Sequence, residues 1–405
     1  MKAVVCTLVL LWPLRTVGFY AWNGADSYGD ARALLRGFAS AYRYPDAGAL
    51  YPDTSVQGIA GVARLMSVGG VGAQFGFEFN AYQSYIPSDL LLGSLASGAA
   101  LDTERSGALD WSYSDDDYVH LAIDRVNARW SAQRLDVRVG RQPVNLATTF
   151  YFTPNDFFAP FAAQAFFRVY KPGVDAARAD YRLDNLSTAS LISVLGYEPD
   201  AEAETGWSGR PDADRTSYLG RLAGVVHDVE LALLVGRVRR TDILGASLQG
   251  EWFDWLGVRA EGHIAAPREH DENNYTELSV GFEHRWPSSL ELRLEYFHHG
   301  SGADDEDDYQ LALRADAGGY LARRYLALGT GYEFTPLLRG EALVIANLVD
   351  DSRLLSLYAV YSLADEAELA LNVGLPFGDQ PEGLRVRSEF GLFPRAGTLE
   401  LRLYF

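Results

Sequence analysis

The chain has 405 residues, of which 48% are hydrophobic and 22% charged, and its mean hydropathy is −0.09. After the N-terminal region it contains no uncharged apolar run of about 18 residues, which argues against membrane-spanning helices there. The 54 acidic residues outnumber the 35 Lys and Arg, giving a formal net charge of −19. This charge argues against a duplex nucleic-acid binder, because phosphate contacts need a basic face.

The N-terminus has the plan of a secretory signal peptide. It begins with a basic residue, continues with an apolar stretch to Leu14 and reaches a small residue at Ala21. The single cysteine, Cys6, lies inside this segment, so the processed chain would carry no thiol, as suits an exported protein. We predict a signal peptide over 1–21 and a single domain over 22–405. The alternative for the first segment is a buried helix.

Segments of about ten residues with alternating apolar and polar positions then follow one another, most regularly from about residue 215 onward. The period of two is clearest in 288–298, where Leu292 and Leu294 face one way and Arg293 and Glu295 the other. Such alternation is typical of strands with one apolar and one polar face. It predicts strands over 31–44, 57–69, 71–84, 117–130, 133–142, 170–182, 187–196, 215–226, 229–238, 242–253, 256–265, 274–286, 288–298, 322–334, 337–349, 353–364, 367–375 and 397–405.

These segments make eighteen strands. A barrel whose two ends lie on the same side of the membrane needs an even number of strands. For that reason we assign 383–393, which also alternates, to the last external loop and not to the wall; sixteen strands is the alternative count. Residues 308–321 alternate only briefly, and we predict a loop or a short external helix there.

Local alternation alone does not separate a soluble sandwich from a membrane barrel, because either can bury or expose the apolar face. Three features of the whole chain favour the barrel. Short turns such as His227-Asp228 alternate with longer acidic stretches, aromatic residues fall near the strand ends, and the chain ends as a strand in phenylalanine. We therefore predict an all-β fold, a transmembrane antiparallel β-barrel. The aromatic residues concerned are Trp252, Trp255, Trp286, Tyr332, Phe334, Tyr361 and Phe405.

Two long insertions, 85–116 and 144–169, would lie at the external end if the first strand rises from the periplasm. Their apolar content is high for solvated loops, so we expect them to fold inward or pack on the rim. The second insertion in particular should fold against the inner wall and narrow the lumen. It contains seven phenylalanines, Phe150, Phe152, Phe157, Phe158, Phe161, Phe166 and Phe167.

The same region resembles porin-like outer-membrane proteins of Gram-negative bacteria. The residues that carry the resemblance are Gly-Arg-Gln at 140–142, Pro-Asn-Asp-Phe at 154–157 and Gly-Val-Asp at 173–175. The terminal strand is similar to the C-terminal signal that the barrel-assembly machinery reads, ending in Phe405. The resemblance implies an outer-membrane location and a channel, and it allows a homotrimer by analogy, but it does not imply a solute.

Charged residues on the inward strand faces are our candidates for lining a pore or anchoring a loop. Arg138 shares a face with Asp136, and Arg141 ends the same strand. Arg141 can pair with Asp156 or Asp175, either in a buried salt bridge that pins the 144–169 loop or in a charged constriction. The full set is Arg138, Arg141, Asp156, Asp175, Arg259, Glu261, Glu291, Arg293 and Glu295.

We predict a passive channel for small polar or charged solutes, with no enzymatic activity, cofactor or bound metal. Its expected partners are outer-membrane lipid, lipopolysaccharide and the solutes. One alternative is an outer-membrane hydrolase of lipase type, in which His263, beside Glu261, would activate Ser279. Another is a barrel that serves an export or assembly complex. The acidic runs 115–117 and 304–308 lack the spacing of a calcium loop and are predicted to be solvated loop charge.

Overall fold

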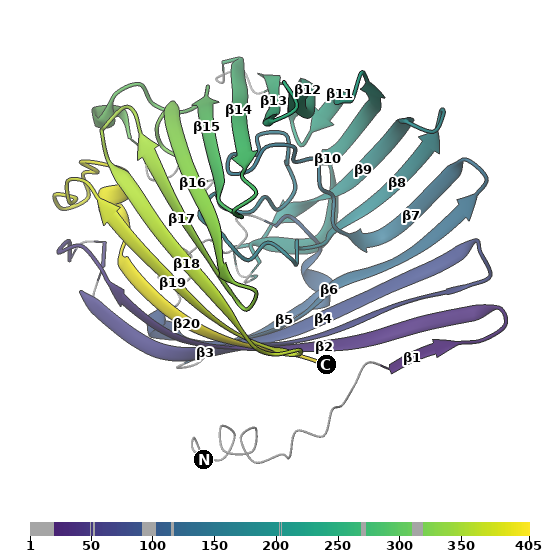
Figure 1. The fold of residues 1–405 in the computed structure, drawn as a ribbon, viewed down its shortest axis with the longest axis horizontal. Coiled ribbons are helices and arrows are strands. Elements are labelled where there is room, and N and C mark those ends of the chain that lie inside the picture. The colour runs from purple at the N-terminus through teal and green to yellow at the C-terminus, as the bar shows by residue number, and fades with distance from the viewer. Residues whose placement is uncertain are drawn as a thin grey trace, which may run out of the picture.

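The computed structural model describes residues 20–48, 50–51, 53–90, 103–114, 117–201, 203, 205–268, 273–309 and 319–405. In this part of the chain twenty antiparallel strands form one sheet, and eighteen of them close into a ring (Figure 1). The predicted fold class and strand count are confirmed. The strands are β1 (Tyr20–Asn23), β2 (Ser27–Arg43), β3 (Ser55–Val71), β4 (Phe75–Pro87), β5 (Asp110–Ser114), β6 (Asp117–Ala132), β7 (Leu135–Gln142), β8 (Val174–Arg182), β9 (Ser187–Pro199), β10 (Trp207–Val226), β11 (Val229–Val238), β12 (Thr241–Trp252), β13 (Leu256–Pro267), β14 (Tyr275–Arg285), β15 (Glu291–His299), β16 (Arg324–Thr335), β17 (Leu338–Asn347), β18 (Arg353–Ala364), β19 (Ala367–Phe377) and β20 (Arg395–Tyr404).

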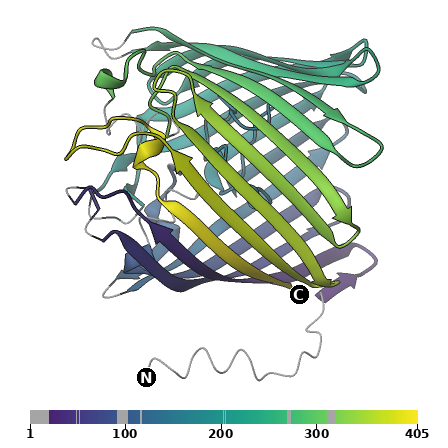
Figure 2. The same ribbon diagram turned by 60° about the vertical axis from the view of Figure 1, so that its left-hand side comes forward.

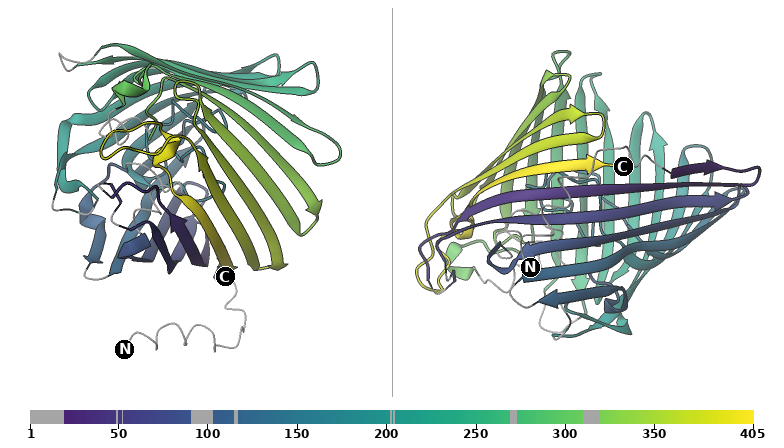
Figure 3. Two further views of the ribbon diagram at one scale, coloured as in Figure 1. Left: turned by 90° about the vertical axis from the view of Figure 1, so that its left-hand side faces the viewer. Right: turned by 90° about the horizontal axis from the view of Figure 1, so that it is seen from below.

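The ring closes where β2 pairs with β20, in a register that runs from Leu34 opposite Tyr404 to Arg43 opposite Arg395. The backbone of Phe405 adds two further hydrogen bonds to Ala33, of 2.8 and 2.9 Å. Beyond this point β1 pairs with the start of β2, so β1 continues the line of β20 past the C-terminus (Figure 3). β1 and β5 are the two strands outside the count of eighteen.

The two faces of the wall differ as the alternation predicts. In β11 the side chains of Leu231, Leu233 and Val235 are 44 to 60% exposed, while Ala232 and Leu234 between them are buried. In β15 Leu292 is exposed on the outer face, and Arg293 points inward onto an aromatic ring of the loop described below. An apolar exterior on every second residue is what a lipid-facing barrel requires.

The two ends of the barrel have different connections (Figure 2). At one end, the short-turn end, the wall strands are joined by hairpins of two to five residues. His227 and Asp228 both have positive φ, 50° and 64°, the backbone conformation of a tight primed turn whose twist matches that of the strands. Exposed aromatic side chains gather at this end, namely Trp252, Phe253, Trp255, Trp286, Tyr332, Phe334 and Tyr361. They form the girdle expected at a membrane interface.

At the other end, the long-loop end, the largest connections join β4 to β6, β7 to β8, β15 to β16 and β19 to β20. Residues 383–393 lie in the last of these and include a short 3-10 helix, Phe390–Leu392, so their assignment to a loop is confirmed. Part of 308–321 lies outside the described residues; just before it, Glu306–Asp308 forms a 3-10 helix. The described part of the chain contains no helix that could cross a membrane.

The sequence boundaries differ from the observed ones mainly at the long-loop end. β10 begins at Trp207, eight residues before the alternation becomes regular, because its first half is a polar extension with two register shifts against β9. β5, a five-residue strand, lies within the predicted insertion 85–116. It pairs with residues 118–122 of β6, whereas β7 pairs with residues 126–132 of the same strand. β5 and β7 thus lie on the same edge of β6, with β5 nearer the long-loop end.

Candidate functional site

The connection between β7 and β8, residues 143–173, folds into the barrel (Figure 1) and is called the inner loop here. Its first half is held by Glu261 of β13. One carboxylate oxygen of Glu261 accepts a 3.1 Å hydrogen bond from the backbone N–H of Thr149 and a shorter one from Thr148. The other oxygen accepts a 3.0 Å bond from the backbone N–H of Asn155. Glu261 is 1% exposed, so these donors replace water around a buried charge.

Glu295 of β15 holds the next residues of the loop in the same way. Its carboxylate accepts hydrogen bonds of 2.9, 3.1 and 2.6 Å from the backbone N–H groups of Phe150, Tyr151 and Phe152. The side chain has no exposure to solvent. Two glutamates of the wall, separated by β14, thus bind the backbone of one loop through six amides.

Aromatic packing fixes the same loop. Phe152 stacks on Phe297 of β15, with ring centroids 4.9 Å apart, and also meets Tyr325 of β16. At the other side Phe158 is buried among apolar residues of β8 to β13, including Ile192 and Leu234. The prediction that 144–169 folds against the inner wall is therefore confirmed.

The end of the inner loop carries two cations, of which Lys171 is buried and Arg168 is half-buried. The Nζ atom of Lys171 forms an ion pair with Asp156, and both residues are less than 7% exposed. Burial raises the pKa of the Asp156 carboxyl and lowers the pKa of the Lys171 ammonium, because each charged form loses its water. Arg168 meets no carboxylate in the described structure; its guanidinium donates to the backbone carbonyls of Phe150, Ala162, Ala163 and Ala165.

Arg141 forms a buried salt bridge, one of the two arrangements expected, but only one of its two carboxylate partners was among the expected acids. It donates to Asp175 at 2.9 Å, as predicted, but its second carboxylate partner is Asp110 of β5, at 3.0 Å, and not Asp156. It also donates to the carbonyl of Ser106 at 2.7 Å. Arg141 therefore pins the loop before β5 at the point where β5 takes the place of β7 beside β6. Its side chain is fully buried, so it does not line an opening.

The remaining candidates lie on the inner wall. The guanidinium groups of Arg259 and Arg293 lie over the ring of Phe150, at 4.3 and 4.6 Å from its centroid. Arg259 pairs with Glu283 at 3.2 Å, and Arg293 pairs with Glu291 at 2.5 Å. These four charged residues support the first half of the inner loop on its short-turn side.

Arg138 lies in a cavity of about 890 Å³ near the short turns, below the inner loop. The cavity is strongly basic: it is also lined by Arg129, Arg134, Arg178, Arg182 and Arg221, with Asp136, Asp180 and Glu230 as the acids. Arg138 is 3.8 Å from Glu78, a loose pair with a third of its side chain exposed. This candidate residue is thus placed in an open, water-accessible cavity.

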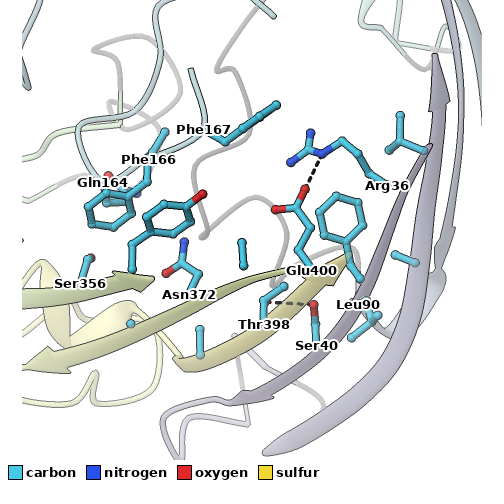
Figure 4. Close-up of a pocket in the computed structure, with 18 of the residues that line it drawn as sticks. Arg36, Ser40, Leu90, Gln164, Phe166, Phe167, Ser356, Asn372, Thr398 and Glu400 are labelled. Carbon is cyan, nitrogen blue, oxygen red and sulfur yellow. Dashed lines mark hydrogen bonds and ion pairs between the residues drawn. The ribbon is translucent and has the colours of Figure 1, made fainter. Parts of the chain in front are cut away.

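Beside the inner loop lies a cavity, which is called the passage here. It has a volume of about 410 Å³ and lies between the residues 161–172 and the wall formed by β2, β3 and β18 to β20 (Figure 4). Its charged lining residues are Arg36, Arg64, Glu400 and Arg402. None of the four was among the sequence candidates, although the signal was present: Arg36, and likewise Glu400 with Arg402, alternates with apolar residues in a predicted strand.

The hydrolase arrangement suggested by the sequence does not form. Nδ1 of His263 lies 3.1 Å from the side-chain oxygen of Asn155, and its ring packs against Phe157 of the inner loop. A different serine and histidine meet at the long-loop end, where Nε2 of His299 lies 3.4 Å from Oγ of Ser301. The same hydroxyl lies 3.5 Å from the carboxylate of Glu277, which itself pairs with His299. Ser301 therefore contacts both members of a buried Glu277–His299 pair.

Comparison with known proteins gives matches in structure only. No protein-family profile and no curated protein sequence matches the chain. Among solved structures, OccK9 (OpdG) of Pseudomonas aeruginosa aligns over 93% of this chain and 98% of its own, with a TM-score of 0.59 and 13% identity. A BenF-like porin from Pseudomonas fluorescens Pf-5 has the same coverages and TM-score at 11% identity. OccK2 (OpdF) of Pseudomonas aeruginosa, in complex with glucuronate, gives 0.56 at 13% identity, again over 93% and 98%.

The barrel therefore has the fold of outer-membrane porins. Its structural neighbours are Occ and related porins, which agrees with the resemblance found in the sequence at the level of a porin-like barrel.

Proposed function

We propose that the protein is an outer-membrane channel of a Gram-negative bacterium, through which small polar solutes diffuse passively. The observation that carries the proposal is the combination of a closed ring with an apolar exterior and an inner loop that narrows the lumen without filling it. The cavity beside the loop has four charged side chains, Arg36, Arg64, Glu400 and Arg402, and several neutral polar ones among its apolar lining residues, which gives a solute polar groups to bind along its way. Its small volume would restrict transport to small molecules.

Within this proposal the nine candidate residues divide into two groups. Arg138, Arg259, Glu291 and Arg293 face the lumen and contribute to its charge. Arg141, Asp156, Glu261 and Glu295 are buried anchors that keep the loops in place, and the partly buried Asp175 has the same role as a partner of Arg141.

The surroundings of the barrel belong to the same proposal. Outer-membrane lipid and lipopolysaccharide would cover the apolar face, the barrel-assembly machinery would read the strand that ends in Phe405, and a homotrimer is the assembly to test. OccK2 was solved with glucuronate, which makes small polar acids one solute class worth testing. We also propose that residues 1–21 are removed on export and that the chain has no catalytic role.

Reconstitution tests the channel directly. Purified protein in planar lipid bilayers should give stepwise ion currents without any energy source. Folding is checked by heat-modifiable migration in gels, which separates a closed barrel from an unfolded chain. Folded protein that is electrically silent over a wide voltage range would exclude the passive channel and favour the export or enzyme alternatives.

A further inference from the structure

The passage beside the inner loop contains arginines whose charges are already neutralised by the wall. Arg36 of β2 pairs with Glu400 of β20 at 2.5 Å (Figure 4). Arg402, also of β20, pairs with the same carboxylate at 2.6 Å and with Glu368 of β19 at 3.3 Å. Two guanidinium groups are thus matched by two carboxylates within one short stretch of wall.

Arg64 of β3, the third arginine of the passage, is matched in the same way. It donates to Asp124 of β6 at 2.7 Å and to the side-chain oxygen of Asn80 at 2.8 Å. Its guanidinium lies between two rings, 4.9 Å from the centroid of Tyr82 and 4.8 Å from that of Tyr170.

The inner loop also covers the faces of the arginine pair. The ring of Phe167 lies 4.2 Å from the guanidinium carbon of Arg36 and 4.1 Å from that of Arg402. The side chain of Arg402 is only 3% exposed and that of Arg36 21%. Each of these guanidinium groups already has a wall carboxylate as its ion-pair partner, so a solute carboxylate would have to share the cation with that carboxylate and lose its own water.

Neutral groups make up the rest of the polar lining. Ser40 and Thr398 form a hydroxyl pair 3.0 Å apart, and Ser356 and Asn372 lie along the neighbouring strands (Figure 4). Beside them on the same wall is an aromatic surface, in which Tyr358 of β18 stacks on Phe166 of the inner loop with centroids 5.0 Å apart and planes inclined by 8°.

We propose that this passage binds neutral polyhydroxylated solutes of the sugar type in preference to carboxylates of the same size. Hydroxyl and amide groups of the wall both donate and accept hydrogen bonds, as the hydroxyls of a sugar do. The aromatic surface matches the apolar face of a pyranose ring. The inference rests on the proposed channel function and names the solute class of that same site.

A matched pair of solutes tests the preference. Methyl glucoside and glucuronate share a ring and differ mainly in charge, and each is added to a conducting bilayer to measure the concentration that halves the ion current. We expect methyl glucoside to block at a lower concentration than glucuronate. Stronger block by glucuronate, or ion conductance that neither solute reduces, would overturn the inference while leaving the channel function intact. Absence of conductance would instead contradict the proposed function itself.

Two variants test whether the preference between the solutes arises at the Arg36–Glu400–Arg402 cluster. Glu400→Gln removes the carboxylate shared by Arg36 and Arg402 and should improve block by glucuronate about tenfold, because charged hydrogen bonds become available to the solute. Glu333→Gln removes a paired carboxylate of equal charge at the short-turn end and should leave both blocking concentrations unchanged. Equal responses of the two variants would show that only net charge matters and would overturn the assignment.

The aromatic surface has its own control. Phe166→Ala should weaken block by methyl glucoside roughly five- to tenfold, whereas Phe77→Ala, on the exposed outer face of β4, should not. Folding of each variant is checked by heat-modifiable migration. Unchanged sugar block in folded Phe166→Ala would place sugar binding elsewhere and contradict the proposal.

Discussion

The lumen has two sides that use carboxylates differently. On the side of β13 and β15, Glu261 and Glu295 accept hydrogen bonds from backbone amides of the inner loop, and no guanidinium of the described residues donates to them. On the side of β2 and β20, Glu400 accepts from two arginines of the wall. The first side is a support for a loop and the second is the boundary of a passage. A buried glutamate in an inward-facing strand position can therefore either hold a loop or form part of the lining of a cavity. The groups that donate hydrogen bonds to it show which of the two it does.

Removing a glutamate that holds the inner loop should have the largest effect on loop stability and conductance. Glu295→Ala leaves the N–H groups of Phe150, Tyr151 and Phe152 without an acceptor, which should destabilise the folded loop by roughly 3 to 6 kcal/mol. We expect the loop to leave the wall and the single-channel conductance to rise clearly.

Glu341→Gln, on β17 and paired with Arg339, serves as the control for this variant, because it changes a partly exposed inner-wall carboxylate that does not hold the loop. Unchanged conductance in folded Glu295→Ala would show that the aromatic packing alone keeps the loop in place.

The buried pair within the inner loop should be sensitive to removal of one partner but not of both. Lys171→Met leaves the Asp156 carboxylate buried without a cation, and about 3 to 5 kcal/mol of stability should be lost. In Lys171→Met with Asp156→Asn most of this loss should disappear, because no unpaired charge remains. Urea unfolding in lipid measures both. A double variant as unstable as the single one would mean that the pair contributes specific geometry beyond charge balance.

The outer and inner faces of one strand give the next test. Leu292→Arg places a charge on the lipid-facing side of β15 and should cost about 2 to 4 kcal/mol or impair assembly. Arg293→Leu should leave the barrel intact and alter ion preference.

Cysteines at the same two positions check the assignment without a stability measurement. A lipid-confined reagent should label position 292, and a small water-soluble reagent position 293. Equal labelling of both by the water-soluble reagent would contradict the membrane barrel.

The smallest effect is expected where the carboxylate neither supports the loop nor lines the passage. Arg285 and Glu333 form an ion pair of 2.7 Å at the short-turn end, with about half of each side chain exposed. Solvent screens such a pair, so Glu333→Gln should change the free energy of unfolding by less than about 1 kcal/mol. A loss as large as that in Glu295→Ala would remove the distinction between support and surface charge.

Most of the wall could be predicted from the sequence, because alternation is a local property that each strand carries in its own residues. The positions of most strands and the outward side of Leu292 follow from it, whereas the inward course of the inner loop does not. The loop's apolar content was enough to place it inside the barrel.

The partners of the charged residues could not be predicted, because they depend on which strands and loops meet in space. Arg141 pairs with Asp110, a residue of a five-residue strand whose alternation is too short to detect. Glu261 and Glu295 were recognised as inward-facing, but the amides that they bind are more than 100 positions away along the chain. Arg36 and Glu400 come together only through ring closure.

The length of β2 has a consequence for the edge of the sheet. β2 has 17 residues and β20 only 10, so ring closure alone would leave the start of β2 with unpaired backbone groups. Such an open edge is a template for strand addition from another molecule. β1 covers it over four residue pairs, and the ring of Trp22 lies against Gly29, where a side chain would collide with it. The proposed cleavage after Ala21 would fall inside β1, so a cut at that position would leave only Trp22 and Asn23 of β1 to protect this edge from unwanted pairing.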